Sequence, residues 1–144
     1  MKFIEETNNL FNYEGKAWLA HCISSDFAMG DGIATQFNGR YNLKKYMTKN
    51  YFKGNWTGQG YCIPVKEYKV FNLITKEKYF KKPTYKSLNQ ALTDMKNYAV
   101  AKGITKIAMP IIGCGLDKLD WNVVRRNIKY IFEKTNITII ICKL

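Results

Sequence analysis

The sequence predicts a three-layer α/β/α sandwich, in which helices cover both faces of a mixed, mostly parallel sheet of about six strands. Helical patterns over 84–102 and 121–134 each lie between two apolar strand-like runs, and such crossover units place their strands parallel in one sheet. A hairpin pattern over 61–75 makes the sheet mixed. Because the chain has no linker or internal repeat, one domain over 1–144 is expected.

The first half of the chain begins with two strands and two helical pieces. Residues 2–5 form a short predicted strand, and 16–23 are a nearly continuous apolar strand, a pattern typical of burial on both faces. A loop with two glycines over 24–32 follows. A short helix is then expected to begin near Ile33, with another helical piece around 43–50.

The hairpin and the second half supply the other strands. Strand-like runs at 61–65 and 68–75 flank a short turn, and Pro64 favours an edge position because proline cannot donate a ladder hydrogen bond. Pro83 opens the next helix and Gly103 ends it. A strand over 104–110 leads into a second glycine loop. Asp120 is then the expected N-cap of the last helix, before an apolar strand over 137–142.

The composition excludes some classes of protein. Hydrophobic residues make up 47% of the chain and aromatic residues 15%, which is too much for a disordered chain. No apolar run reaches the ~18–20 residues that span a bilayer, and the acidic N-terminus does not resemble a signal peptide. We therefore expect a cytoplasmic monomer without a membrane partner. The formal net charge of +12 would attract nucleic acid or a diphosphate, although solvated lysine faces are the commoner explanation.

Cysteine and histidine are too sparsely placed for a metal site. The four cysteines, at 22, 62, 114 and 142, form no CxxC pair, and His21 is the only histidine. The pattern favours reduced thiols and no metal or other cofactor. His21 lies within a predicted buried strand, where a hydrogen-bonded structural role is expected. Cys114 lacks a second histidine that would activate it as a nucleophile.

Two glycine loops, each between a buried strand and a helix, suggest a ligand site. One contains Met29-Gly30-Asp31-Gly32, and the other runs from Gly113 to Asp117. Glycine permits positive φ and close approach of a phosphate, and backbone N–H groups crowd at such joints. If the two strands are neighbours in the sheet, the loops flank one cleft that suits a diphosphate linking two sugars. A single Gly-x-Gly has little value, whereas two in this context favour that interpretation.

Several segments, taken in order, carry a resemblance to a known family. They are Leu19-Ala20-His21-Cys22-Ile23-Ser24, Met29-Gly30-Asp31-Gly32-Ile33-Ala34, Leu73-Ile74-Thr75-Lys76, Lys82-Pro83-Thr84-Tyr85 and the run from Met109 to Asp117. On these segments, which cover nearly the whole chain, the sequence resembles macrodomains, and specifically the terminal ADP-ribose protein glycohydrolase branch.

The resemblance implies an ADP-ribosyl hydrolase that removes ADP-ribose from modified acidic side chains, or from related esters or nucleobases. It implies that Lys76 attacks the anomeric carbon of the distal ribose and that Asp117 acts as acid and base. The expected partner is ADP-ribose, or an ADP-ribosylated protein or nucleic acid. The expected binding residues are Asn9, Leu10, Ser24, Gly30, Gly32, Ile33, Thr75, Pro110, Ile111, Ile112, Gly113, Cys114, Gly115, Leu116 and Leu144.

Two positions depart from the pattern of that branch. Asn9 stands where the branch usually has an aspartate that accepts a hydrogen bond from the adenine amino group; an amide oxygen still accepts, but without charge. Ile111 stands where the branch tends to have arginine, which removes a cation near the ligand. Both changes bear on substrate range.

Other functions remain open at this stage. A module that only binds ADP-ribose or a signalling nucleotide would need neither Lys76 nor Asp117. Outside this context, the lysine would be a solvated surface residue and the aspartate a helix cap. A phosphatase acting on ADP-ribose-1''-phosphate is a further alternative within the same fold.

Overall fold

The computed structural model describes residues 1–50, 60–115 and 117–144, and its described strands form one sheet in the order β1-β6-β5-β2-β4-β3. The strands are β1 (Lys2–Thr7), β2 (Trp18–Ser24), β3 (Tyr61–Val65), β4 (Val70–Lys76), β5 (Lys106–Met109) and β6 (Thr138–Lys143). The helices are α1 (Gly32–Tyr41), α2 (Leu43–Asn50), α3 (Tyr85–Ala101) and α4 (Trp121–Phe132), with a 3₁₀ helix η1 (Leu10–Tyr13).

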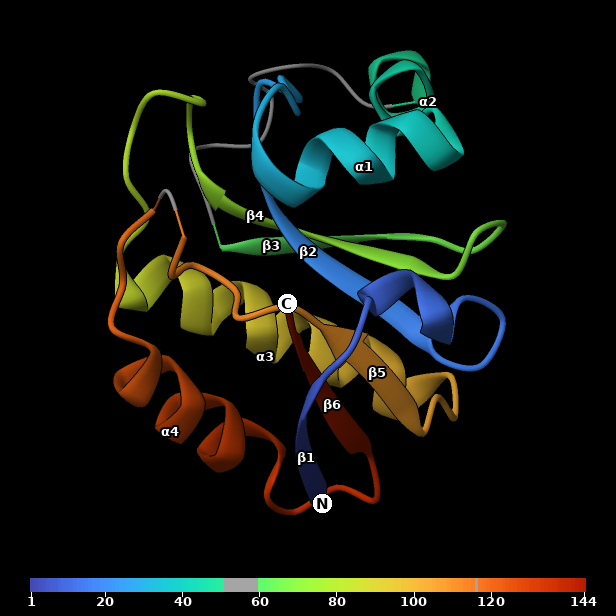
Figure 1. Ribbon diagram of the computed structural model, residues 1–144, viewed down its shortest axis with the longest axis vertical. Helices are drawn as coiled ribbons and strands as arrows, with labels where there is room; N and C mark the ends of the chain where they lie inside the picture. The colour runs from blue at the N-terminus through green and yellow to red at the C-terminus, as the bar shows by residue number, and fades with distance from the viewer. Residues whose placement is uncertain (51–59, 116) are drawn as a thin grey trace.

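Helices cover both faces of the sheet, as Figure 1 shows. Within β6, Ile139 and Ile141 belong to the core shared with α3 and α4, whereas Ile140 and Cys142 belong to the core shared with η1, α1 and α2. Successive strand residues point to opposite faces, so an unbroken apolar strand requires an apolar layer on each side. The predicted three-layer sandwich is confirmed.

The central strands β5, β2 and β4 are adjacent and parallel. Their carboxyl ends therefore meet at one edge of the sheet, together with the loops that follow them. The one antiparallel pairing among the described strands joins β3 to β4. β3 lies at the sheet edge, which confirms the position predicted from Pro64.

Of the six predicted strands, only that over 61–65 has the boundaries of the structure. β1 runs to Thr7 rather than to 5, β2 covers Trp18–Ser24 rather than 16–23, and β6 covers Thr138–Lys143 rather than 137–142. The strand expected over 68–75 begins only at Val70, because the turn extends through Lys69, whose φ is 55°. The strand expected over 104–110 covers only β5, since the N–H of Ile104 still bonds to the carbonyl of Ala99 in α3 at 2.9 Å. None of the described helices is long and apolar enough to cross a bilayer.

Side-chain caps start the two long helices. Thr84 caps α3 in a capping box with Ser87: each side-chain oxygen accepts from the other residue's backbone N–H at 3.0 Å. The Ser87 hydroxyl also donates to the carbonyl of Thr75 in β4 at 2.7 Å. At α4, the side chain of Asp120 accepts from the N–H of Asn122 at 2.9 Å, so the predicted N-cap is confirmed.

Candidate active site

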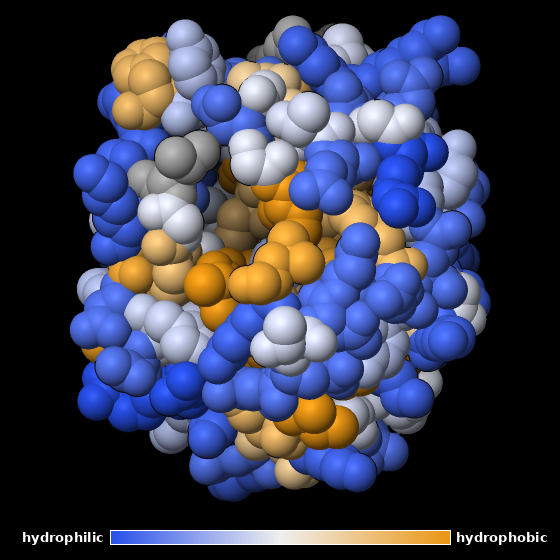
Figure 2. All heavy atoms as spheres, in the orientation of Figure 1, coloured by the Kyte–Doolittle hydropathy of each residue, from blue (hydrophilic) through white to orange (hydrophobic). Residues whose placement is uncertain are grey.

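A cleft of about 920 Å³ opens at the carboxyl ends of the central strands. The loop between β2 and α1 forms one wall, and the loop after β5 forms another. The segment that follows β4 completes the lining. Figure 2 shows a hollow in this face with apolar atoms inside it and mainly hydrophilic atoms around it. The volume falls in the range of about 300–1,000 Å³ that is usual for small-molecule sites.

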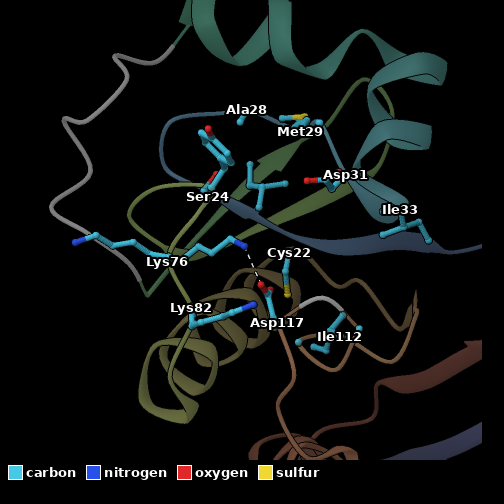
Figure 3. A pocket seen from close by; sticks show the side chains of 18 of the residues that line it. Cys22, Ser24, Ala28, Met29, Asp31, Ile33, Lys76, Lys82, Ile112 and Asp117 are labelled. Carbon is cyan, nitrogen blue, oxygen red and sulfur yellow. Dashed lines mark hydrogen bonds and ion pairs between the residues drawn. The ribbon is translucent and has the colours of Figure 1, made fainter.

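Lys76 and Asp117 meet inside this cleft. Lys76 is the last residue of β4, and Asp117 follows the glycine loop after β5; Nζ and Oδ1 are 2.8 Å apart. Each side chain is 16% exposed. Figure 3 shows the two groups pointing toward one another, with Lys82 also extending toward the carboxylate. Because the pair is partly shielded from water, its charge-assisted hydrogen bond is stronger than one on an open surface.

The glycine loop after β5 is folded tightly enough to place Asp117. The N–H of Leu119 bonds to the carbonyl of Gly113 at 2.8 Å, and that of Lys118 to the carbonyl of Gly115 at 3.2 Å. Gly113 has φ 73°, and a Cβ there would lie 3.0 Å from a methyl carbon of Leu119. Glycine is needed at this position because of both the backbone conformation and the lack of space.

The loop before α1 presents backbone groups on the opposite wall. Gly32 has φ 58°, and a Cβ on either Gly30 or Gly32 would meet no atom within 4 Å. The backbone beside them is therefore open to the cleft. α1 begins at Gly32, so its free N–H groups and the positive end of its dipole lie at this wall.

Asp26 joins this loop to the segment after β4. Its carboxylate accepts hydrogen bonds from the Ser24 hydroxyl, from the N–H of Ala28 at 3.1 Å and from the N–H of Tyr79 at 3.0 Å. Burial alone would raise the pKa of Asp26, but these bonds and nearby Lys78 hold it below its usual value. The loop before α1 and the segment after β4 are thus fixed to each other.

A second link between the same two segments runs through Ser25. Its N–H bonds to the carbonyl of Lys76 at 2.9 Å, and its hydroxyl donates to the carbonyl of Glu77 at 2.6 Å. Both acceptors lie where β4 ends. The backbone that carries the Lys76 side chain is therefore bonded directly to the loop that follows β2.

The cysteines near the cleft are poor nucleophiles. Burial, and then the nearby Asp117 carboxylate, raise the pKa of the Cys22 thiol to about 12. Burial and the Asp120 carboxylate raise that of Cys114 to about 11. Both thiols are protonated at neutral pH, and only a thiolate is reactive. This favours the amine of Lys76 over either sulfur as the nucleophile.

His21 is a structural residue in the middle of the sheet. Its Nε2 lies 2.6 Å from Oδ1 of Asn72, whose amide donates to the carbonyl of Ile63 at 3.0 Å. The amide orientation makes Nε2 the donor. The ring is fully buried and stacks on Phe37 with centroids 3.9 Å apart. Burial lowers the pKa of His21 to about 4, so the ring is neutral at physiological pH.

The structure brings most of the predicted site residues to the cleft. Those that line it are Ser24, Gly30, Gly32, Ile33, Lys76, Pro110, Ile111, Ile112, Gly113, Gly115 and Asp117. Leu116 lies outside the described residues. In the described part of the chain, no group of three or more His, Cys, Asp or Glu side chains is placed to hold a metal ion.

The remaining predicted residues lie outside the lining of this cleft. Asn9 caps η1 by accepting from the N–H of Phe11 at 3.0 Å, and Leu10 is buried in the core. Thr75 is 1% exposed and borders a smaller pocket of about 210 Å³. Cys114 turns its thiol to the carbonyl of Ile112, and Leu144 is 92% exposed at the chain end. The list of residues that line the cleft does not include these five.

Sequence reasoning missed the segment just after Lys76. Tyr79, Phe80, Lys81 and Lys82 all line the cleft. Of these four residues, only Lys82 was named from the sequence, as part of a segment that carries the resemblance. The available signal was an aromatic pair enclosed by lysines between a strand end and Pro83. Asp31 and Lys118 also line the cleft and were not expected there.

The layered fold, with its ligand-sized cleft beyond β2, β4 and β5, is that of a macrodomain. The family model described as "Macro domain" matches residues 20–128, and the chain belongs to this family. The expected family and fold are confirmed.

Curated relatives and solved structures agree with this assignment. The human protein "ADP-ribose glycohydrolase OARD1" is 37% identical over 126 residues, which cover 88% of this chain and 81% of the relative. "Uncharacterized protein 032R" of invertebrate iridescent virus 6 is 38% identical over 60 residues, 42% of this chain and 60% of the relative. Among solved structures, "Macrodomain of Thermus aquaticus DarG" superimposes with a TM-score of 0.84 at 20% identity, covering 99% and 98% of the two chains. "Thermosipho africanus DarTG in complex with ADP-ribose" has a TM-score of 0.78 at 18% identity; the match covers this whole chain and 42% of that one.

Proposed function

We propose that this protein is an ADP-ribosyl hydrolase in which Lys76 and Asp117 perform the reaction. The observation that carries the proposal is their contact at 2.8 Å within the cleft, where each side chain is only 16% exposed. A module that only binds its ligand has no use for an amine and a carboxylate held together at the edge of a nucleotide-sized cleft. The printed name of the human relative, a glycohydrolase of ADP-ribose, supports the same reading.

The walls of the cleft suit the diphosphate of ADP-ribose. The open backbone at Gly30 and Gly32, with the N-terminus of α1, offers N–H donors and a positive dipole end on one side. The loop around Gly113 and Gly115 offers backbone on the other side. Held between them, the diphosphate would direct one ribose toward Lys76 and Asp117.

The proposed reaction starts with proton transfer from Lys76 to Asp117. The neutral Nζ then forms a bond to the anomeric carbon of the distal ribose, while the acceptor oxygen leaves with the electrons of its bond to that carbon. The secondary ammonium formed in this way gives one proton to water. The nitrogen lone pair then forms the C=N bond while the bond between the anomeric carbon and the ring oxygen breaks, Asp117 gives its proton to that oxygen, and the lysine is left in a protonated Schiff base. Water adds to the imine carbon, which releases ADP-ribose and restores the amine.

The substrate we propose is ADP-ribose joined to a protein carboxylate or to a nucleic acid. A carboxylate is a good leaving group and requires no acid catalyst. Ile111, which lines the cleft and is 38% exposed, gives the lining an apolar side chain where the related branch tends to have a cation. We expect this exchange to affect the affinity for the acceptor rather than the chemistry at Lys76.

Borohydride trapping tests this proposal. The wild-type protein, incubated with an ADP-ribosylated glutamyl peptide and then reduced, should gain the mass of one ADP-ribosyl group plus the two hydrogens that reduction adds to the imine. Lys76→Ala should gain none, and Lys134→Ala, which removes an exposed lysine outside the cleft lining, should behave like the wild type. No adduct and no release of ADP-ribose by the wild type would refute hydrolysis. If the wild type still bound free ADP-ribose tightly, the binding-module alternative would be favoured.

A further inference from the structure

Two exposed aromatic side chains stand at the mouth of the cleft. Tyr79 is 61% exposed and Phe80 65%, and their rings lie 5.4 Å apart at 89°. Both residues line the cleft, as does Ile111, another exposed large hydrophobic residue. Exposed rings lose hydrophobic stabilisation in the free protein, so a pair gathered at a ligand site indicates a contact surface.

The segment that carries the two rings, residues 78–81, is fixed by hydrogen bonds of its backbone N–H groups. The N–H of Tyr79 bonds to the Asp26 carboxylate at 3.0 Å, and the N–H of Lys81 bonds to the carbonyl of Lys78 at 3.0 Å, which closes a turn around the two rings. A surface ordered before binding loses less entropy when a ligand arrives. The rings are therefore presented in a defined position beside Lys76.

Lysines surround the pair. Lys78, Lys81 and Lys82 are exposed residues on either side of it. Lys81 pairs with Glu77 at 4.0 Å, where both side chains are about half exposed, and such surface pairs contribute little and leave the cation available. The whole chain carries a net charge of +12. Polyanions are thus drawn to the place where the rings are exposed.

Two adjacent rings flanked by lysines fit a single-stranded nucleic acid better than a protein surface. Proteins that bind single strands combine aromatic side chains, on which bases stack, with positive groups beside the phosphates. A hydrophobic protein partner would need a wider apolar patch than two rings enclosed by lysines. An acidic peptide would meet the lysines but would gain little from the rings.

We infer that Tyr79 and Phe80, with Lys78 and Lys81, bind a single-stranded nucleic acid at the cleft mouth, its bases stacked on the rings and its phosphates beside the lysines. A strand that carries ADP-ribose would then present that group to Lys76. Only this last consequence rests on the proposed function; the binding of the strand itself does not.

Binding of a labelled, unmodified single strand of about ten nucleotides tests the inference by fluorescence anisotropy. The double variant Tyr79→Ala/Phe80→Ala should bind roughly tenfold more weakly or worse, because stacking contributes strongly per base. Tyr130→Ala, which removes an aromatic side chain 74% exposed on α4, is the matched control and should bind like the wild type. The variant Tyr79→Phe/Phe80→Tyr keeps an aromatic ring at both positions and should bind the strand as tightly as the wild type.

Two further measurements distinguish the contribution of base stacking from that of charge. One is the dependence of affinity on salt concentration, and the other is the affinity for a duplex, whose bases are not free to stack on the rings. Lys81→Ala should flatten the plot of log affinity against log salt by up to ~0.7 for a lost phosphate contact, and Lys134→Ala should flatten it less. Equal affinity for wild type and the double aromatic variant would overturn the inference, as would equal affinity for single strand and duplex. The same holds if the strand fails to bind while release from a glutamyl peptide depends on the rings, which would assign them to protein acceptors. The assay uses no ADP-ribose, so a failure of the borohydride test leaves its outcome unaffected.

Discussion

Acidification should destabilise this protein through His21. Burial lowers the pKa of the ring to about 4 in the folded protein, whereas histidine in an unfolded chain titrates near ~6.5. As the pH falls below ~6.5, His21 becomes protonated in the unfolded state but stays neutral in the native state, so the free energy of unfolding falls. The loss continues down to the folded pKa of about 4 and then levels off.

The magnitude of this effect follows from the two pKa values. Between about pH 7.5 and about pH 5, proton linkage at this one site removes about 2 kcal/mol from the free energy of unfolding. The physical source is the complete burial of an imidazole that has one polar contact, at Nε2 with Asn72. Its Nδ1 has no hydrogen-bond partner in the described part of the chain, so nothing there stabilises a second ring proton.

Urea unfolding at both pH values measures the effect, with His21→Gln as the comparison. Glutamine has a donor for Asn72 but does not titrate, so the variant should be less stable at neutral pH yet lose less on acidification. Glu5 and Asp26 also have lowered pKa values, and their contributions too fall with pH, but both proteins share them and they cancel in the difference. If wild type and variant lost the same stability, a buried neutral imidazole would not be the cause.

Two further predictions concern the glycine loop and the carboxylate that it places. Gly113→Ala should lower the free energy of unfolding by about 1–2 kcal/mol in urea titrations, because φ there is 73° and the added carbon would lie 3.0 Å from a side-chain carbon of Leu119. Gly39→Ala, within α1 and with nothing within 4 Å of the added carbon, should stabilise by up to about 1 kcal/mol; a similar loss at both glycines would contradict the conformational argument. Asp117→Asn should reduce the rate of adduct formation about 10²–10⁴-fold while calorimetry shows ADP-ribose binding changed only slightly, since it removes a proton acceptor but keeps the shape. Unchanged rates in that variant would remove Asp117 from the proposed reaction.

The fold was largely predictable because its strands and its helices have different patterns of apolar residues in the sequence. The run at 137–142 is apolar at nearly every position, and the structure confirms that its residues face two different cores. Boundaries were less predictable where local chemistry competes with pattern. Tyr68 is of a residue type that favours strands, but the left-handed backbone conformation of Lys69 extends the turn through Lys69, so the strand begins at Val70.

The parts of the candidate site that lie in recognisable sequence motifs were predictable. The residues that reach the cleft only through contacts between distant parts of the chain were not. Both loops were predicted from their glycines, and Lys76 and Asp117 from the family resemblance, although only the structure shows the two groups in contact. The pattern of an aromatic pair between lysines at 78–82 does not by itself place the pair at the cleft, since that placement depends on a hydrogen bond from the N–H of Tyr79 to Asp26, fifty-three positions earlier. A sequence pattern does not reveal a contact over that separation.

The hydroxyl of Ser87 links the start of α3 to the strand that ends at Lys76. It accepts from Thr84 within the capping box and donates to the carbonyl of Thr75, the residue just before the lysine. Fraying of the first turn of α3 would therefore release the backbone next to the amine. Amide exchange at this turn should therefore increase over the same temperature range in which turnover at the cleft declines, because one side chain couples local melting to the geometry of the nucleophile.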